Sequence, residues 1–291
     1  MSDAAVAKNP NAGGAMDFLR GPLSIAIYTW REGYRKKSLV GFLILSLLVI
    51  FGSSFLSSFL DQTYVGDAES DINVKLIKDI CVSTISIFGV LITIFISASV
   101  VPNEVENKVI YTVLSKPVRR YQYLLGKFAG VQCIVIMNLV LMGGLFFIAL
   151  WVRQGIMPTL LLWSILLTYF EFLIVSAFTF ALSCTSTSSV LPTIGGLFIY
   201  IVGNLTEYLK DVDIRSGQSD DLVNVIIGYT AKALYNILPN LQNFSLKTQI
   251  LNSLPNDPPT DVLIPNLIVY GLVYAASGFL LSLLIFWRKE L

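Results

Sequence analysis

The stretch that decides the fold lies at residues 80–120, where an apolar run is followed at once by a charged segment. Residues 80–101 read ICVSTISIFGVLITIFISASVV, and residues 102–120 read PNEVENKVIYTVLSKPVRR. The hydrocarbon core of a bilayer requires about 20 predominantly apolar residues in a helix. The first run therefore predicts a helix that spans a membrane, and the second predicts a structured segment outside it.

Five other segments resemble the first run in their apolar character. The chain is 55% hydrophobic and only 13% charged, whereas a water-soluble protein has about 25% charged residues. The chain therefore has too few charges to cover a soluble surface of its size. We expect an all-α membrane protein whose residues 21–291 form one transmembrane domain. The six predicted transmembrane helices cover about 39–60, 80–101, 124–150, 160–183, 190–205 and 264–287.

Three further segments surround the predicted spans. Residues 1–20 are mostly small or polar and are expected to form a disordered tail. Residues 24–37 combine aromatic and basic side chains, which favours an N-terminal interfacial helix, although any first span also needs such a basic flank. In residues 206–263, apolar residues at helical spacing over 222–237 and 244–254 predict short extracytoplasmic amphipathic helices before the last span.

The distribution of positive charge predicts the orientation. Segments on the side of the N-terminus contain 13 Lys and Arg residues, against 7 in the segments on the other side. Cytoplasmic segments carry the excess of Lys and Arg in membrane proteins. We therefore expect a multi-pass protein of the cell (inner or plasma) membrane with both termini in the cytoplasm. The net charge of +1 does not favour a nucleic-acid partner.

A separate helix is predicted over residues 103–116, between the second and third spans. Pro102 is expected to end the second span, and Asn103 is expected to cap a new helix with Glu106 three residues later. Acidic residues suit the first turn of a helix because of its dipole, and Pro117 prevents continuation. Such a helix is either a lever that receives force from a partner or an ordinary interfacial linker. The residues expected to anchor the re-entry are Arg119, Arg120 and Lys127.

The same segment resembles the permease subunits of type-2 ATP-binding-cassette (ABC-2) exporters. The similar residues are Glu104-x-Glu106, then Leu114-Ser115-x-Pro117-Val118-x-Arg120, and then Leu125-Gly126-Lys127. The closing FWRKEL of residues 286–291 is also similar to family C-termini. Many members have Gly-Thr after the second glutamate, where this chain has Asn107-Lys108.

The resemblance implies a function and two kinds of partner. Residues 103–116 would be a coupling helix that docks on a separate cytoplasmic ATPase, which would bind ATP and Mg²⁺. A second permease copy or a paralogue would complete the pathway within the lipid bilayer, and this chain would bind no cofactor itself. The implied ATPase-coupling residues are Glu104, Glu106, Asn107, Lys108, Ser115, Pro117, Arg119 and Arg120.

Glu171 is the one charged residue deep within a predicted span. A charge at the centre of a bilayer costs about 2.5–3.5 kcal/mol on insertion scales, so it usually faces protein or water. We expect Glu171 to be protonated or paired with an amide, such as that of Asn138 or Asn204. Its neighbours either line a pathway or join helices by hydrogen bonds. The candidate pathway or interface residues are Asn138, Thr168, Glu171, Tyr200 and Asn204.

Small residues mark two further helix faces. Gly126 and Gly130 form a GxxxG pattern at the start of the third span, which is weak evidence of a contact face. Gly196 and Gly203 lie on one face of the fifth span together with Tyr200, and they permit close approach within the chain or to a second copy.

The sequence argues against catalysis by this chain. It contains no histidine, so it lacks the commonest general base and metal ligand. Its three cysteines form no CxxC pair, so no metal site is predicted. We weigh two alternatives to an exporter permease: a membrane scaffold or assembly factor with the same fold, and an intramembrane enzyme. The transported substrate is not readable from the sequence.

Overall fold

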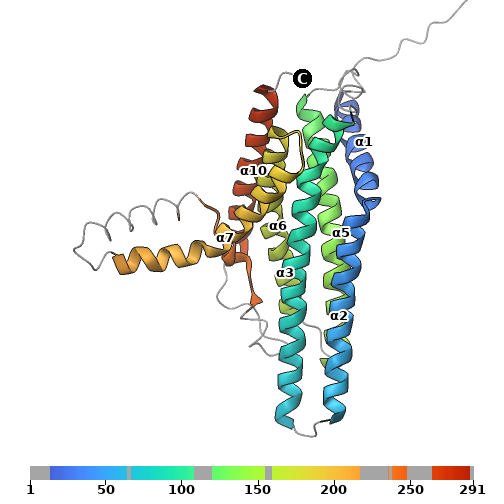
Figure 1. Cartoon of the computed structure of the whole chain (residues 1–291), viewed down its shortest axis with the longest axis vertical. Helices are drawn as coiled ribbons and strands as arrows, with labels where there is room; N and C mark the ends of the chain where they lie inside the picture. The colour runs from blue at the N-terminus through green and yellow to red at the C-terminus, as the bar shows by residue number, and fades with distance from the viewer. Residues whose placement is uncertain are drawn as a thin grey trace, which may run out of the picture.

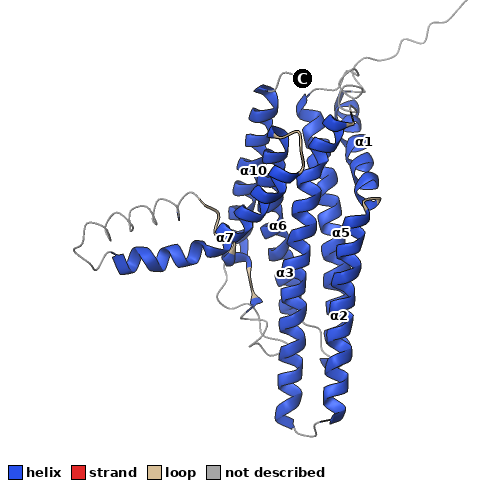
Figure 2. Ribbon diagram, viewed as in Figure 1, coloured by secondary structure: helices blue, strands red, loops and turns tan. Residues whose placement is uncertain are grey.

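A computed structural model of the chain describes residues 14–63, 67–107, 120–154, 159–216, 235, 238–247 and 264–288. Within these residues the regular structure is helical and contains no strand (Figure 2). The elements are α1 Gly14–Tyr34, α2 Lys37–Thr63, α3 Asp67–Glu106, α5 Arg120–Gln154, α6 Thr159–Thr185, α7 Val190–Ser216, the short 3-10 helix η1 Gln242–Phe244, and α10 Ile264–Arg288. The prediction of an all-α fold is therefore confirmed.

Each predicted span lies within one of these helices. By length and apolar composition, four helical segments can cross a membrane: Ile77–Glu106, Arg120–Val152, Leu160–Thr185 and Ile264–Arg288. The apolar parts found in α2 and α7 are shorter, over Leu39–Ser53 and Val190–Thr206. The structure thus supports several membrane-spanning helices, and the count of six remains a prediction.

Helix α6 lies at the centre of the bundle. It packs against α3, α5, α7 and α10, and its strongest packing is with α10 (Figure 1). The side chains of its middle, from Phe170 to Ala177, are all buried. A helix that is apolar on all sides suits either a protein core or a membrane span. Its contacts with four other helices are what place α6 at the centre.

The two glycines of the GxxxG pattern hold α1 against α5. A Cβ atom at Gly126 would lie 2.6 Å from the carbonyl oxygen of Pro22, and one at Gly130 would lie 2.6 Å from Cβ of Thr29. Only glycine permits so close an approach of two helix backbones. The predicted contact face is therefore real, and its partner is α1 of the same chain.

Several predicted boundaries differ from those observed. Helix α1 begins at Gly14, within the predicted tail, because Ala15, Met16 and Leu19 favour helix. Helix α3 continues through Pro102 to Glu106, so Asn103 does not cap a new helix. Proline costs a helix interior about 3 kcal/mol, and burial of Pro102 and its neighbours in the bundle outweighs that cost.

Helix α7 continues beyond its predicted end to Ser216, and its last part projects sideways from the bundle (Figure 1). Later in the chain, the segment 239–247 folds back onto α7 and α3. The backbone N–H of Leu241 donates to the carbonyl of Gly203 at 3.1 Å, and Lys247 forms an ion pair of 2.8 Å with Asp79 of α3. The two helices predicted over 222–237 and 244–254 lie mostly outside the described residues.

Candidate functional site

The most heavily charged buried site lies where α3 ends and α5 begins. The Glu104 side chain belongs to the last turn of α3, and only 4% of this residue is exposed. Lys127 of α5 forms an ion pair with one carboxylate oxygen of Glu104, and the Tyr123 hydroxyl donates a hydrogen bond to the other. Both oxygens of the carboxylate are therefore satisfied from α5. We call these three residues the charged cluster.

Local helix geometry places the two α5 residues for this role. Tyr123 and Lys127 are four residues apart, so they lie on one face of α5, one turn apart. Both are buried, with exposed fractions of 0% and 1%. Glu104 reaches them because α3 runs on past Pro102 as a continuous helix. The continuation of α3 past Pro102, which was not predicted from the sequence, therefore brings Glu104 to Lys127.

Aromatic rings extend the charged cluster to two more helices. The Lys127 ammonium lies 5.2 Å from the centre of the Tyr28 ring of α1. The Tyr123 ring stacks on Phe286 of α10 with ring centres 5.9 Å apart. A cation over an aromatic face gains about 0.5–2 kcal/mol, more when water is excluded. The cluster therefore joins α1, α3, α5 and α10 at one end of the bundle, which we call the charged end.

A second polar link at the charged end involves the turn between α1 and α2. The Lys36 ammonium donates a hydrogen bond to the Ser99 hydroxyl of α3 at 2.8 Å. Burial lowers the pKa of Lys36 below its usual value, and the charge of Lys127 lowers it further, while Glu32 and Glu104 raise it. The turn between α1 and α2 therefore shares the electrostatic field of the charged cluster.

The burial of the charged cluster gives two residues surroundings that the sequence did not suggest. Glu104, expected to take part in ATPase coupling, and Lys127, expected to anchor the re-entry, are both enclosed, and their predicted roles remain predictions. Glu104 also lies at the C-terminal end of a helix, where the helix dipole disfavours an anion. Lys127 offsets that field. Glu104 therefore fastens the base of the 103–120 segment within the chain and offers no free surface in this structure.

The other predicted coupling residues lie at the ends of the same segment. Glu106 and Asn107 are exposed at the end of α3, and the Asn107 amide donates to the carbonyl of Asn103 at 2.8 Å. The Asn103 amide oxygen accepts a hydrogen bond of 3.2 Å from Ser189, which precedes α7. Arg120 opens α5 and is partly exposed. Lys108, Ser115, Pro117 and Arg119 lie outside the described residues.

The second candidate site surrounds Glu171 in the middle of α6, where only 5% of the residue is exposed. Its carboxyl group faces the Asn204 side chain of α7, which also faces the Tyr200 side chain, and the Asn204 amide donates to the backbone carbonyl of Tyr200 at 3.0 Å. The structure thus brings together three of the five predicted residues. Asn138 instead donates to the carbonyl of Ile134 in its own helix at 2.8 Å, and Thr168 is partly buried on α6.

One polar contact between helices was not predicted from the sequence. The Gln132 amide of α5 donates to the Ser176 hydroxyl of α6 at 2.7 Å, and Ser176 donates onward to the carbonyl of Leu173. The amide oxygen of Gln132 is buried without a hydrogen-bond partner among the described residues. The sequence signal for this contact was the polar residue Gln132 within an apolar span, because such residues commonly join membrane helices by hydrogen bonds.

The small-residue face of α7 packs within the chain. A Cβ at Gly196 would lie 2.5 Å from the Thr179 hydroxyl of α6, and one at Gly203 would lie 2.6 Å from Leu241. The face of α7 that a second copy could contact is therefore the opposite side of the helix. That side carries exposed apolar residues at helical spacing: Val190, Ile194, Phe198, Ile201 and Leu205.

In the part of the chain that the structure describes, no three His, Cys, Asp or Glu residues lie close enough together to hold a metal ion.

Comparison with known protein families identifies a match over most of the chain. The family model described as "ABC-2 family transporter protein" matches residues 23–291. No curated protein matches the chain. The matched range contains all six predicted spans, the charged cluster and the Glu171 site.

Proposed function

Because the chain belongs to the ABC-2 family of transporter proteins, we propose that it is the membrane-spanning permease subunit of an ATP-driven exporter. ATP and Mg²⁺ bind to a separate cytoplasmic ATPase, and this chain forms the pathway. It sits in the cell membrane with six spans and both termini in the cytoplasm. Helix α2 supports that count because it contains the apolar run 39–60, and about 20 apolar residues suffice to cross a bilayer; the fifth span is the shortest, with its apolar part over Val190–Thr206.

The charged cluster is the observation that carries the coupling proposal. It ties the end of α3 and the start of α5 to α1 and α10, so both ends of the 103–120 segment are fixed to the bundle. A segment with rigid ends transmits a push from a docked ATPase to four helices together. The ATPase therefore contacts exposed residues of the segment, including Glu106 and Asn107. The buried Glu104 transmits the movement from the segment to the other helices of the bundle.

The exposed stripe of α7 supports a second permease copy. Val190, Ile194, Phe198, Ile201 and Leu205 recur at spacings of three and four, which places them on one face of the helix. In this proposal the same stripe of a second copy, or of a paralogue, packs against it. Formation of a disulfide-linked dimer by Phe198→Cys in a Cys133→Ser background tests the contact, because Cys133 is the exposed cysteine.

Charge reversal at an exposed residue of the segment tests the coupling proposal. Glu106→Lys reverses an exposed charge and should weaken association with the ATPase about tenfold, which corresponds to about 1.4 kcal/mol. Gln242→Lys, an exposed position outside the segment, is the matched control. ATPase association is measured by titration in proteoliposomes, together with ATP turnover. Unchanged association and turnover for Glu106→Lys would contradict the docking role.

Transport itself requires a second readout. An exporter couples cargo to nucleotide hydrolysis, so candidate cargoes should raise ATP turnover of the reconstituted complex above its basal rate. A complex that assembles with the ATPase but shows no such stimulation with any cargo would instead be a membrane scaffold with an exporter fold.

A further inference from the structure

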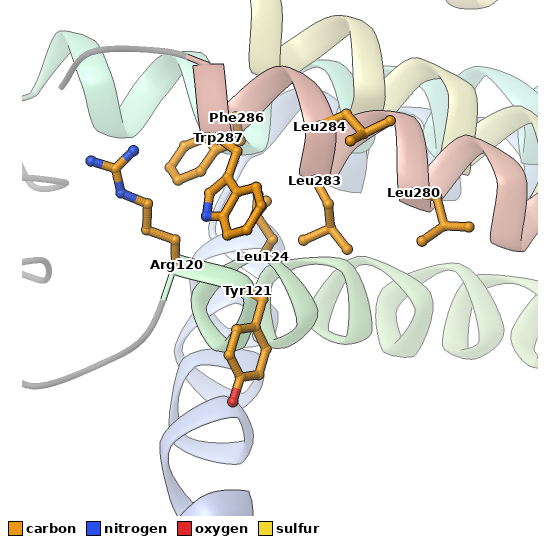
Figure 3. A pocket seen from close by; sticks show the side chains of 8 residues that line it. All are labelled: Arg120, Tyr121, Leu124, Leu280, Leu283, Leu284, Phe286 and Trp287. Atoms are coloured by element: carbon orange, nitrogen blue, oxygen red, sulfur yellow. The ribbon is translucent and has the colours of Figure 1, made fainter.

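An apolar groove of about 450 Å³ runs between the start of α5 and the end of α10 at the charged end. Its walls include Leu124 of α5 and Leu280, Leu283 and Leu284 of α10, with Arg120 and Trp287 at one end. Figure 3 shows Leu280 and Leu283 pointing from α10 toward α5, with the Arg120 side chain beyond Trp287. The groove therefore combines an apolar trough with a cationic end.

The groove opens toward the surroundings of the bundle. Leu280, Leu284 and Trp287 are exposed, although they belong to a helix apolar enough to cross a membrane. Acyl chains, and not water, are what surround such side chains in a bilayer. From Leu280 to Trp287 the helix rises about 10 Å, at about 1.5 Å per residue. That length accommodates part of one acyl chain alongside the helix.

The charges at the end of the groove select the headgroup. Arg120 lines the groove, Arg288 follows Trp287 in the last turn of α10, and no carboxylate lines the groove among the residues that the structure describes. A guanidinium has five N–H donors, so it can hold a neighbouring group and a phosphate at once. Tryptophan favours the depth of lipid headgroups because one edge of its ring is polar. Basic pockets between transmembrane helices are suited to anionic lipid headgroups.

We propose that the groove between α5 and α10 binds one anionic phospholipid, with an acyl chain along Leu280–Leu284 and the phosphate at Arg120. The lipid would touch Leu124, next to Tyr123 of the charged cluster, and Phe286, on which the Tyr123 ring stacks. Bilayer composition would therefore bear on the rigidity of the charged end. The inference needs only that the chain lies in a membrane, and it stands independently of ATPase coupling.

Quenching of Trp287 fluorescence by brominated lipids tests the site. The other three tryptophans, Trp30, Trp151 and Trp163, are replaced by phenylalanine in the full chain, which is reconstituted in nanodiscs. Dibrominated phosphatidylglycerol should reach half-quenching at a several-fold lower lipid fraction than dibrominated phosphatidylcholine. Arg120→Gln should abolish that preference, whereas Lys37→Gln, which removes an exposed cation outside the groove, should retain it.

Three outcomes would contradict the proposal. Equal quenching by the two lipids means that the groove holds ordinary surrounding lipid without selecting a headgroup. Disulfide-linked dimers of Leu284→Cys in a Cys133→Ser background mean that a second copy of the chain occupies the groove. Circular dichroism and size-exclusion elution confirm that each variant is folded. A folded Arg120→Gln protein that still prefers phosphatidylglycerol also contradicts the assignment of the phosphate to Arg120.

Discussion

Glu104 and Glu171 are both buried carboxylates on neighbouring helices, yet their partners differ in kind. Glu104 meets an ammonium and a phenol from α5, and Glu171 meets the amide of Asn204. Glu104 lies in the last turn of its helix, where a long basic side chain at the start of α5 can reach it. Glu171 lies mid-helix, among apolar neighbours. The two buried acids therefore differ in whether the partner side chain carries a charge.

The difference indicates two structural roles. Removal of one partner of a buried ion pair leaves the other charge buried without a partner, which is strongly destabilising. The pair therefore holds its helices in one arrangement. A neutral hydrogen bond between membrane helices is worth only about 0.6 kcal/mol on average, so it permits adjustment. We therefore expect the charged end to be the firmer part of the bundle and the α6–α7 contact to be the part that adjusts.

Breaking the charged cluster should have the largest effect. Glu104→Leu leaves the Lys127 ammonium buried without its partner, and loss of one partner of a buried pair costs about 3–5 kcal/mol. The free energy of unfolding, measured by denaturant titration in mixed micelles, should fall by that amount. The double variant Glu104→Leu/Lys127→Met should recover most of it, because two apolar groups replace the pair. A double variant as unstable as the single one would show that the pair itself is not the cause.

Crowding the contact between α1 and α5 should have the next largest effect. A methyl group at Gly130 would lie 2.6 Å from Cβ of Thr29 and 2.8 Å from the carbonyl of Ala26. Overpacking of this kind costs about 1–3 kcal/mol, so Gly130→Ala should lower the thermal unfolding midpoint. Gly144→Ala on the same helix is the control, because nothing lies within 4 Å of its added methyl group. Equal midpoints for the two variants would contradict the close packing of α1.

The Glu171 site should respond more weakly than the charged cluster. Asn204→Leu removes the amide partner, and hydrogen bonds between membrane helices contribute about 0.6 kcal/mol and at most about 1.7 kcal/mol. A double-mutant cycle with Glu171→Gln measures the coupling energy between the two side chains by denaturant titration. A coupling energy as large as that of Glu104 with Lys127 would remove the distinction between the two sites.

The smallest effect on stability is expected at Glu106. Its side chain is exposed at the end of α3, and surface substitutions usually change stability by less than about 0.5 kcal/mol. Glu106→Gln should therefore unfold at the wild-type midpoint in a thermal melt, although it lies two residues from the most sensitive position. A clear loss of stability would place Glu106 within the charged cluster.

The sequence determined the helical class, the position of each apolar helix and the GxxxG contact face. These are local properties, since about 20 apolar residues or two glycines one turn apart act through their own segment. It also singled out Glu104 and Glu171 as candidate functional residues, which remains a prediction, and Asn204 as one partner that Glu171 could have. Pro102 misled the prediction because its local cost to a helix is real, and only burial among other helices outweighs it.

The tertiary structure alone decided which side chains meet. Lys127 could have faced lipid headgroups or Glu104, and Asn138 could have reached Glu171 or its own backbone. The sequence permits each of these, because the rotation and register of one helix against another come from packing along their whole length. The same packing turned the small face of α7 inward, left its apolar stripe exposed, and opened the groove between α5 and α10 beside Arg120.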